Sequence, residues 1–300
     1  MTIQLRGVLG PVVTTFDAAS GELDLPAFET NLRAHLAAGL HGLVVAGSTG
    51  EAVLLDESER ERLVESARAV IPRDRLLIVG AGAEATRTVI RRARHAARAG
   101  ANAVLVVSPH YYSAAMTADA LRAHFRRVAD ESPVPVVLYN IPKYVGFAIP
   151  PALVAELAVH PNVIGIKDSS GDRDQLSGYL RAQGDDFAVL TGSGTMYQAS
   201  LAAGARGGIL AVALFAPEAS LAVYEASGRG DAAAALAAQA LLAPLGATIV
   251  GALGVAGVKA ALDLVGLRGG AVRPPLMPLG PSDLEKVRAL LTEGALAVGS

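Results

Sequence analysis

The sequence predicts an α/β fold, a closed (β/α)8 barrel followed by a C-terminal helical extension, from three observations. Eight short runs rich in β-branched residues recur along the chain, and each ends at Gly, Ser, Thr or Pro or at a polar side chain. Amphipathic segments rich in Ala, Arg and Glu lie between them. The runs are apolar without strict alternation, which is typical of parallel strands covered on both faces. The alternative is an open doubly wound sheet.

The repeat gives the expected elements in order. The expected strands cover residues 7–15, 42–48, 76–80, 103–108, 135–140, 163–167, 188–192 and 207–212. The clearest helices between them are expected over residues 26–38, 57–70, 86–99, 117–130 and 150–159. Gly39, Gly100 and Gly204 each stand between a helix and the next strand, where glycine commonly ends a helix.

The organisation predicts one structural unit in two parts. No Pro/Ser-rich linker or break in composition divides the repeats, so we expect a TIM barrel over residues 1–215. Residues 216–300 have no strand pattern and are expected to form helices packed on the barrel that assist assembly.

Composition excludes several functions. The 26 basic and 28 acidic residues give a net charge of −2, and no basic stretch indicates a nucleic-acid surface. The chain has no cysteine, which excludes disulfides, cysteine-ligated zinc and thiol catalysis. The six histidines lack metal-ligand spacing, so no metal is expected. Residues 1–10 lack the pattern of a secretory signal, and a cytoplasmic location is expected.

One uncharged stretch, residues 232–258, is long enough to cross a bilayer. It consists mostly of Ala and Gly, and Pro244 lies near its middle. Weakly apolar residues insert poorly into lipid, and glycines such as Gly251 and Gly254 divide the stretch into short helices. We therefore expect packed helices, some of them at a subunit interface, and no association with a membrane.

Functional groups of such a barrel gather at the C-terminal ends of its strands. Lys167 directly follows Val163-Ile164-Gly165-Ile166 and still belongs to the strand, so Val163, Gly165 and Lys167 are expected to share one face. Gly165 would leave room beneath the lysine. Desolvation in a barrel mouth favours the neutral amine, the form that attacks a carbonyl. The alternative is a structural salt bridge to Asp168.

Two further groups could serve such an amine. Tyr139 ends the preceding strand, and its phenol could move protons while an imine forms, or could instead be an aromatic cap. Gly47-Ser48-Thr49-Gly50-Glu51 makes a tight turn after a strand, and its N–H groups could hold a carboxylate while Ser48 relays a proton to Tyr139.

A glycine motif offers a different interpretation. Gly80-Ala81-Gly82-Ala83-Glu84-Ala85 follows a strand and precedes a helix, as a dinucleotide fingerprint does. The next strand, however, ends in Val107-Ser108-Pro109 without the acidic residue that would bind a ribose. A nicotinamide site is thus disfavoured, and no cofactor is expected.

Four motifs together resemble the dihydrodipicolinate synthase/N-acetylneuraminate lyase family of pyruvate-dependent class I aldolases, over nearly the whole chain. They are Gly47-Ser48-Thr49-Gly50-Glu51, Ser108-Pro109-His110-Tyr111-Tyr112, Tyr139-Asn140-Ile141-Pro142 and Gly165-Ile166-Lys167-Asp168-Ser169-Ser170-Gly171. The stretches Gly257-Val258-Lys259 and Arg273-Pro274-Pro275-Leu276 are similar to the family as well.

The resemblance implies a role for each matching residue. Lys167 would form the imine with pyruvate or a 2-oxo acid, and Tyr139 would be the acid/base. Tyr111 would enter a neighbour's site and complete a hydroxyl relay with Ser48 and Tyr139, which implies a homotetramer built as a dimer of dimers. The substrate-binding residues would be Ser48, Thr49, Ser169, Gly192 and Ile209.

Departures from the family pattern bear on the substrate. Dihydrodipicolinate synthases carry an arginine for the carboxylate of the aldehyde where this chain has Tyr144. Sialic acid lyases carry an Asp-Glu pair where Gly194 and Thr195 stand. Where the family has the histidines and asparagine of its lysine-feedback site, this chain has Glu57, Arg60 and Glu84.

Three regions most resemble 4-hydroxy-2-oxoglutarate aldolases: residues 108–116, Lys167-Asp168-Ser169 and the C-terminal block. One mismatch is Thr49, where that group tends to have asparagine. We therefore expect retro-aldol cleavage of 4-hydroxy-2-oxoglutarate to pyruvate and glyoxylate. The alternatives are 4-hydroxy-tetrahydrodipicolinate synthesis, a sugar-acid aldolase, and a non-catalytic sensor of 2-oxo acids.

Overall fold

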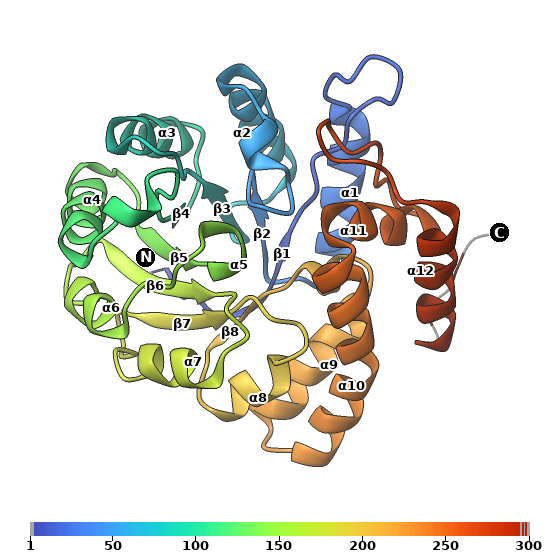
Figure 1. Ribbon diagram of the computed structural model, residues 1–300. Coiled ribbons are helices and arrows are strands. Elements are labelled where there is room, and N and C mark those ends of the chain that lie inside the picture. The colour runs from blue at the N-terminus through green and yellow to red at the C-terminus, as the bar shows by residue number, and fades with distance from the viewer. Residues whose placement is uncertain (1–2, 295, 297, 299–300) are drawn as a thin grey trace.

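The computed structural model describes residues 3–294, 296 and 298 and shows eight parallel strands closed into a barrel. The strands follow one another around the barrel in chain order, and β1 pairs with β8 through Gly7 and Gly207. Figure 1 shows helices surrounding this barrel, with α10–α12 added on one side. The TIM barrel predicted from the sequence is confirmed, and the open doubly wound sheet is excluded.

The strands are short and are buried along nearly their whole length. They are β1 (Gly7–Pro11), β2 (Gly42–Val45), β3 (Leu76–Gly80), β4 (Ala103–Val107), β5 (Val136–Asn140), β6 (Val163–Asp168), β7 (Ala188–Thr191) and β8 (Gly207–Ile209).

Helices follow the strands around the barrel and continue into the C-terminal block. The α-helices are α1 (Leu25–Ala37), α2 (Glu57–Val70), α3 (Thr86–Arg98), α4 (Ala118–Glu131), α5 (Pro142–Val145), α6 (Pro151–Leu157), α7 (Arg173–Leu180), α8 (Tyr197–Ala202), α9 (Pro217–Gly228), α10 (Ala232–Leu245), α11 (Gly254–Leu264) and α12 (Pro281–Glu293). Three short 3-10 helices are η1 (Ala52–Leu54), η2 (Ser113–Ala115) and η3 (Ala211–Leu214), and η4 (Gly246–Ala252) is a π-helix.

Several strands end earlier than the sequence predicts. β2 stops at Val45 because Ala46 has a left-handed backbone, with φ 53°, that turns the chain out of the sheet. β8 stops at Ile209 because η3 begins two residues later. β1 likewise ends at Pro11, whereas β6 continues one residue further than expected, to Asp168. The strands are therefore present where predicted, but their apolar sequence continues into the loops.

Local sequence explains where the helices begin and end. Asp56 accepts a hydrogen bond from the backbone N–H of Glu59, whose side chain accepts one from Asp56 N–H, so a capping box starts α2. The glycines expected after helices, Gly39, Gly100 and Gly204, have φ angles of 93°, 89° and 111°. In that left-handed region a side chain is strained, so glycine ends these helices as predicted.

The apolar core has two layers, one inside the barrel and one between the strands and the helices. The N-terminal segment closes the bottom of the inner layer, where Leu5 is 5% exposed. The register between β5 and β6 is irregular between Val136 and Val137. Val163 consequently packs in the outer layer, and the expectation that it shares a face with Lys167 is wrong.

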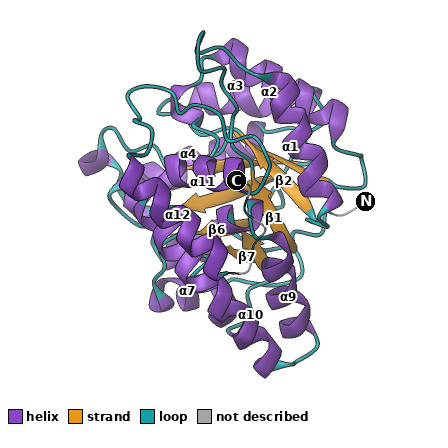
Figure 2. Cartoon of the chain, turned by 90° about the vertical axis from the view of Figure 1, so that its right-hand side faces the viewer, coloured by secondary structure: helices purple, strands orange, loops and turns teal. Residues whose placement is uncertain are grey.

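The C-terminal helices pack along the barrel rather than standing apart from it. By length and composition the helical stretch Ala232–Ala252 could cross a bilayer, with a mean hydropathy of 1.8. In this structure α10 lies beside α9, as Figures 1 and 2 show, and Leu242, Leu245 and Ile249 are buried against the core. The most apolar part of this stretch is 33% buried, so it packs on the rest of the protein along one face. The outer bounds of the two expected parts, residues 1 and 300, lie outside the described residues.

Candidate active site

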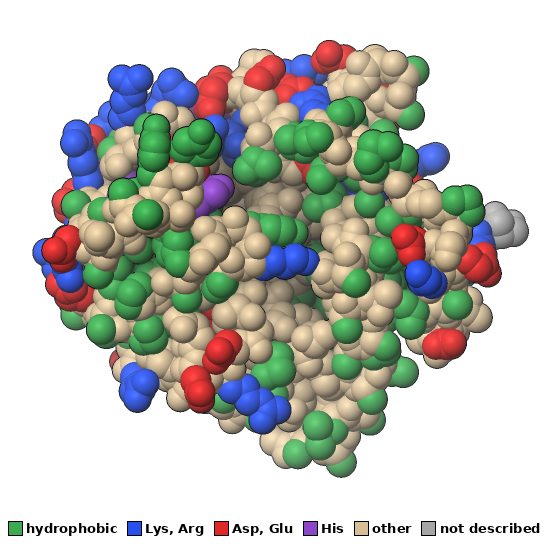
Figure 3. Space-filling model, viewed as in Figure 1, with side chains coloured by type: hydrophobic (Ala, Val, Ile, Leu, Met, Phe, Trp, Pro, Cys, Tyr) green, Lys and Arg blue, Asp and Glu red, His purple; other side chains and the backbone are tan. Residues whose placement is uncertain are grey.

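A pocket of about 420 Å³ opens at the C-terminal ends of the strands. Figure 3 shows the hollow near the middle of this face. Seven of the eight residues expected in the site line this pocket: Ser48, Thr49, Tyr139, Lys167, Ser169, Gly192 and Ile209. The barrel thus brings together residues from β5, β6, β8 and the connections that follow β2, β6 and β7.

Lys167 is buried at the mouth of the barrel. It lies one residue before the end of β6 and is 6% exposed. In the register of the two strands it stands opposite Tyr139, and its Nζ lies 4.3 Å from the centre of the tyrosine ring. The amine is therefore buried against the tyrosine ring, and both residues line the pocket.

The alternative role for Lys167, a salt bridge to Asp168, is not what the structure shows. Successive side chains of a strand point to opposite faces. The Asp168 carboxylate accepts hydrogen bonds from Asn140 Nδ2 at 2.7 Å and from Ser170 Oγ at 2.8 Å. Burial raises the pKa of Asp168, and these hydrogen bonds oppose the rise. Within the described chain Lys167 forms no ion pair, so its amine is free to react.

Space around the amine comes from Gly192 rather than from Gly165. A Cβ atom on Gly192 would lie 1.9 Å from Ser169 Oγ and 2.9 Å from Lys167 Cε. A Cβ on Gly165 would instead meet the backbone of Ala188 and the side chain of Leu5. The room expected beneath the lysine is thus already filled by protein, and the ligand-facing space lies beside it.

The turn after β2 places two hydroxyl groups in the pocket. The N–H groups of Gly50 and Ala52 donate to the carbonyl of Gly47, and Thr14 Oγ1 donates to the carbonyl of Gly50 at 2.7 Å. The backbone N–H groups of Ser48 and Thr49 have no acceptor among the described residues, which leaves them for a ligand carboxylate. Ser48 and Tyr139 line the same pocket, but no hydrogen bond joins their hydroxyl groups in the described chain.

Tyr111 is the one expected site residue that lies outside the pocket. Its side chain is 77% exposed and packs edge-to-face on Tyr112, with ring centres 5.0 Å apart. The N–H groups of His110 and Tyr111 both donate to Glu84 at 2.9 Å, which fixes the loop that carries the two tyrosines. In a single chain Tyr111 therefore lies outside the pocket that contains Lys167, and its participation stays a prediction about the assembly.

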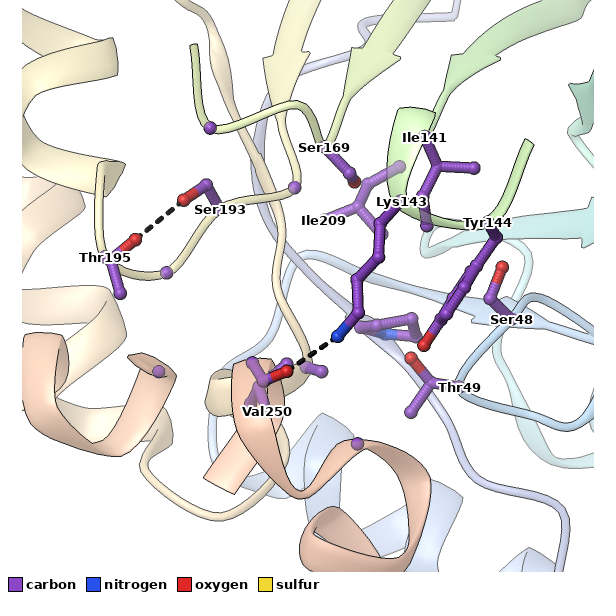
Figure 4. Close-up of a pocket in the computed structure, with 18 of the residues that line it drawn as sticks. Ser48, Thr49, Ile141, Lys143, Tyr144, Ser169, Ser193, Thr195, Ile209 and Val250 are labelled. Atoms are coloured by element: carbon purple, nitrogen blue, oxygen red, sulfur yellow. Dashed lines mark hydrogen bonds between the residues drawn. The ribbon is translucent and has the colours of Figure 1, made fainter. Parts of the chain in front are cut away.

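Lys143 also lines the pocket, although the sequence analysis did not single it out. It follows the proline of Tyr-Asn-Ile-Pro in α5, and Figure 4 shows its side chain extending past Tyr144 towards Val250. The signal was available, because Lys143 directly follows a strand-end motif in a chain with only four lysines. Residues of η4 and α11, including Gly251 and Val255, complete the wall, so the C-terminal block forms part of the site.

The glycine motif after β3 has a packing role. A Cβ on Gly80 would lie 2.0 Å from the carbonyl oxygen of Ala46, and one on Gly82 would meet the side chain of Val107. Neither glycine lines the pocket. Close backbone packing therefore accounts for the pattern that suggested a dinucleotide site.

The chain is similar to several known proteins over nearly its full length. A 4-hydroxy-tetrahydrodipicolinate synthase of Methanoculleus marisnigri is 36% identical over 288 residues, covering 95% of this chain and 98% of the relative. An uncharacterised DapA-like lyase of Halobacterium salinarum is 37% identical over 289 residues, covering 96% and 94% of the two chains.

The chain is also similar to solved structures of dihydrodipicolinate synthases and proteins of their family. Dihydrodipicolinate synthase from Thermotoga maritima superimposes with a TM-score of 0.91 at 32% identity, covering 97% of this chain and 99% of that one. The prophage protein YagE from E. coli K12, of the dihydrodipicolinic acid synthase family and solved with pyruvate, gives 0.91 at 31% identity, covering 98% and 100%. The model of the dihydrodipicolinate synthetase family matches residues 4–294. This chain therefore belongs to that family and is an enzyme, a carbon–carbon lyase of the class I aldolase type.

Proposed function

We propose that the protein joins or cleaves pyruvate-derived 2-oxo acids through an imine on Lys167. The observation that carries this proposal is the buried amine of Lys167, 4.3 Å from the ring centre of Tyr139, in a pocket whose described lining contains no acidic residue. A buried amine without a carboxylate partner is suited to attack a ketone.

The geometry supports a complete sequence of bond changes. Lys167 Nζ attacks the C2 carbonyl of pyruvate, and proton transfers through Tyr139 let the carbinolamine oxygen leave as water. Tyr139 passes a C3 proton of the resulting iminium on, which gives an enamine. The enamine C3 then bonds to the carbonyl carbon of an aldehyde, the iminium re-forms, and the same proton returns through Tyr139 to the former aldehyde oxygen, which becomes a hydroxyl. Water hydrolyses the product imine and frees Lys167. Cleavage follows the same steps in reverse.

The other residues of the pocket bind the substrate in this proposal. The free N–H groups and hydroxyls of Ser48 and Thr49 hold the carboxylate of the 2-oxo acid. Ser169 and Ile209 contact its remaining atoms, and Gly192 leaves the space that the imine needs. No protein-bound cofactor enters these steps.

Two reactions with different aldehydes are candidates, and one observation favours each. The names of the relatives favour 4-hydroxy-tetrahydrodipicolinate synthesis, which was the alternative in the sequence analysis. Tyr144, in place of the arginine expected in such synthases, favours another acceptor, with glyoxylate from 4-hydroxy-2-oxoglutarate as the first to test. The relatives give the synthase the stronger support.

Reductive trapping tests the imine. With pyruvate and borohydride, the intact protein should gain the mass of the reduced adduct, and the peptide that contains Lys167 should carry it. Lys167→Ala should show no adduct. An unchanged mass of the wild-type protein would rule out the proposal.

Turnover assays separate the two candidate reactions. Pyruvate consumption with aspartate semialdehyde supports the synthase, whereas pyruvate release from 4-hydroxy-2-oxoglutarate supports the cleavage reaction. A pyruvate adduct without turnover of either compound points to another aldehyde partner, and sialic acid and 3-deoxy-2-oxo sugar acids are then the next substrates to test.

We further propose that the enzyme is a cytoplasmic homotetramer built as a dimer of dimers. The exposed pair Tyr111 and Tyr112 supports a close subunit contact near the site, because large aromatic side chains are enriched in interfaces. A solved neighbour described as the first monomeric dihydrodipicolinate synthase variant is consistent with oligomers as the usual state of such synthases.

A further inference from the structure

Lys143 brings a second ammonium group into the pocket. Its side chain leaves the first turn of α5 and crosses to η4, where Nζ donates a hydrogen bond to the carbonyl of Gly251 at 2.6 Å (Figure 4). The residue thus connects the loop after β5 with the C-terminal helices across the entrance of the site.

The charge of Lys143 is not neutralised by the protein. Among the described residues it forms no ion pair, and no Asp or Glu lines the pocket. Some basic side chains elsewhere do have such partners, as Arg33 has Glu29 and Arg127 has Glu131. An ammonium group has three donors, so the bond to Gly251 leaves two N–H groups for a ligand.

The pocket therefore offers separate partners for two anionic groups. Under the proposed function, the turn at Ser48 and Thr49 takes the carboxylate of the pyruvyl half, and Lys167 is used in the imine. Lys143 is the cation that remains. One ammonium balances one carboxylate, whereas a phosphate dianion would keep an uncompensated charge.

We infer that Lys143 binds a second carboxylate of the substrate, the one contributed by the aldehyde half, and so selects dicarboxylic over monocarboxylic substrates. The bound carboxylate takes the two free N–H donors or replaces the carbonyl of Gly251. This inference rests on the proposed function and identifies the acceptor as an aldehyde that carries an acid group. It uses a residue adjacent to Tyr144, at a position to which the sequence comparison gave no role.

The test compares two 2-oxo acids of equal length, 2-oxoglutarate with two carboxylates and 2-oxopentanoate with one. The readout is the concentration of each that gives half-maximal borohydride trapping on Lys167, which needs no knowledge of the natural acceptor. The wild-type protein should trap 2-oxoglutarate at about a tenfold lower concentration, since a charge-assisted bond supplies about that much affinity.

Three variants complete the experiment. Lys143→Met should lose most of the preference for 2-oxoglutarate, and Lys143→Arg should keep it. Lys286→Met, at an exposed lysine paired with Asp283, should behave as wild type. Absence of the preference in the wild-type protein, or its survival in Lys143→Met, would overturn the inference. If pyruvate itself is not trapped by the wild-type protein, the imine proposal fails, and that result is distinct from a failure that concerns Lys143 alone.

Discussion

Lys259 and Glu51 form an ion pair inside the protein, with Nζ and Oε1 2.5 Å apart and side chains 2% and 0% exposed. Lys259 lies in α11, whereas Glu51 ends the turn that carries Ser48 and Thr49. The backbone N–H of Arg273 donates to the other oxygen of Glu51 at 2.8 Å. The C-terminal block therefore holds the turn with Ser48 and Thr49 in place through buried charge.

Removing one partner of this pair should destabilise the whole protein. Lys259→Met leaves the Glu51 carboxylate buried without its cation, and we expect the free energy of unfolding to fall by roughly 3–5 kcal/mol. We propose that residues 1–215 and 216–300 form one cooperative unit, so urea denaturation followed by circular dichroism should show a single transition, displaced to lower urea.

A surface lysine and a double variant supply the controls. Lys286→Met removes an exposed ion pair and should change stability by less than about 1 kcal/mol. Combining Lys259→Met with Glu51→Gln should recover part of the loss, because no unpaired charge then remains buried. Equal stability of Lys259→Met and Lys286→Met would show that the buried pair has no structural role.

Much of the fold follows from local sequence. Runs such as Val136-Val137-Leu138 are short and rich in β-branched residues, which favours covered strands, and Gly39, Gly100 and Gly204 mark helix ends. Strand ends were less predictable. Residues 46–48 are apolar or small and resemble a continued strand, but the left-handed backbone at Ala46 turns them away from the sheet.

The site was predictable where one side chain sits at the end of one strand, as Lys167 and Tyr139 do. It was not predictable where residues distant in the sequence meet. The bond from Lys143 to Gly251 joins residues 108 positions apart, and the pair Lys259–Glu51 depends on how the C-terminal block folds back. Local periodicity carries no information about such contacts.

Gly192→Ala should slow imine formation without unfolding the protein. The added methyl group would lie 1.9 Å from Ser169 Oγ and 2.9 Å from Lys167 Cε, so the lysine must shift from its reactive position. We expect the rate of pyruvate trapping to fall at least tenfold, the cost of a small misplacement of reacting groups.

Gly228→Ala is the matched control, because no atom lies within 4 Å of the added methyl group. Alanine favours a helix over glycine, so this variant should be as stable as wild type or slightly more so, with normal trapping. If both glycine variants trap pyruvate at the wild-type rate, the space beside Lys167 has no role in imine formation.

Tyr139→Phe should affect turnover more than binding. The ring that packs beside Lys167 Nζ is kept, whereas the proton-transferring hydroxyl is lost. We expect kcat to fall by roughly 10²–10⁴-fold with a smaller change in KM, as for loss of a general acid/base. Steady-state kinetics with the substrate that the turnover assays identify measures both constants, and an unchanged kcat would exclude the acid/base role.

Tyr111 should act in a neighbouring subunit. Its 77% exposed side chain cannot take part in the pocket of its own chain as described here. Tyr111→Phe alone and Lys167→Ala alone should each have low activity. Co-expressed at equal levels, the two chains should form hybrids in half of the dimers. In a hybrid, one of the two sites combines an intact Lys167 with an intact Tyr111 from the other chain. The mixture should therefore recover about a quarter of wild-type activity. No recovery would place Tyr111 outside the active site of its neighbour.

Acid should destabilise the protein through His35 in α1. Burial lowers the pKa of this histidine from 6.5 to about 4, and its Nε2 has no partner in the described chain. Between these two pH values the unfolded chain binds a proton that the folded chain does not, so the stabilisation is complete above about pH 6.5 and is lost as pH falls towards 4. The shift corresponds to about 3 kcal/mol.

His35→Leu should remove this contribution while it keeps an apolar side chain in the core. Urea denaturation at several pH values between 7 and 4 should show a smaller loss of stability for the variant than for wild type, by about 3 kcal/mol at the acid end. Carboxylates and His124, whose pKa burial also lowers to about 4, contribute equally to both proteins and cancel in the difference. Parallel pH profiles would mean that His35 takes up its proton in the folded protein as readily as in the unfolded chain.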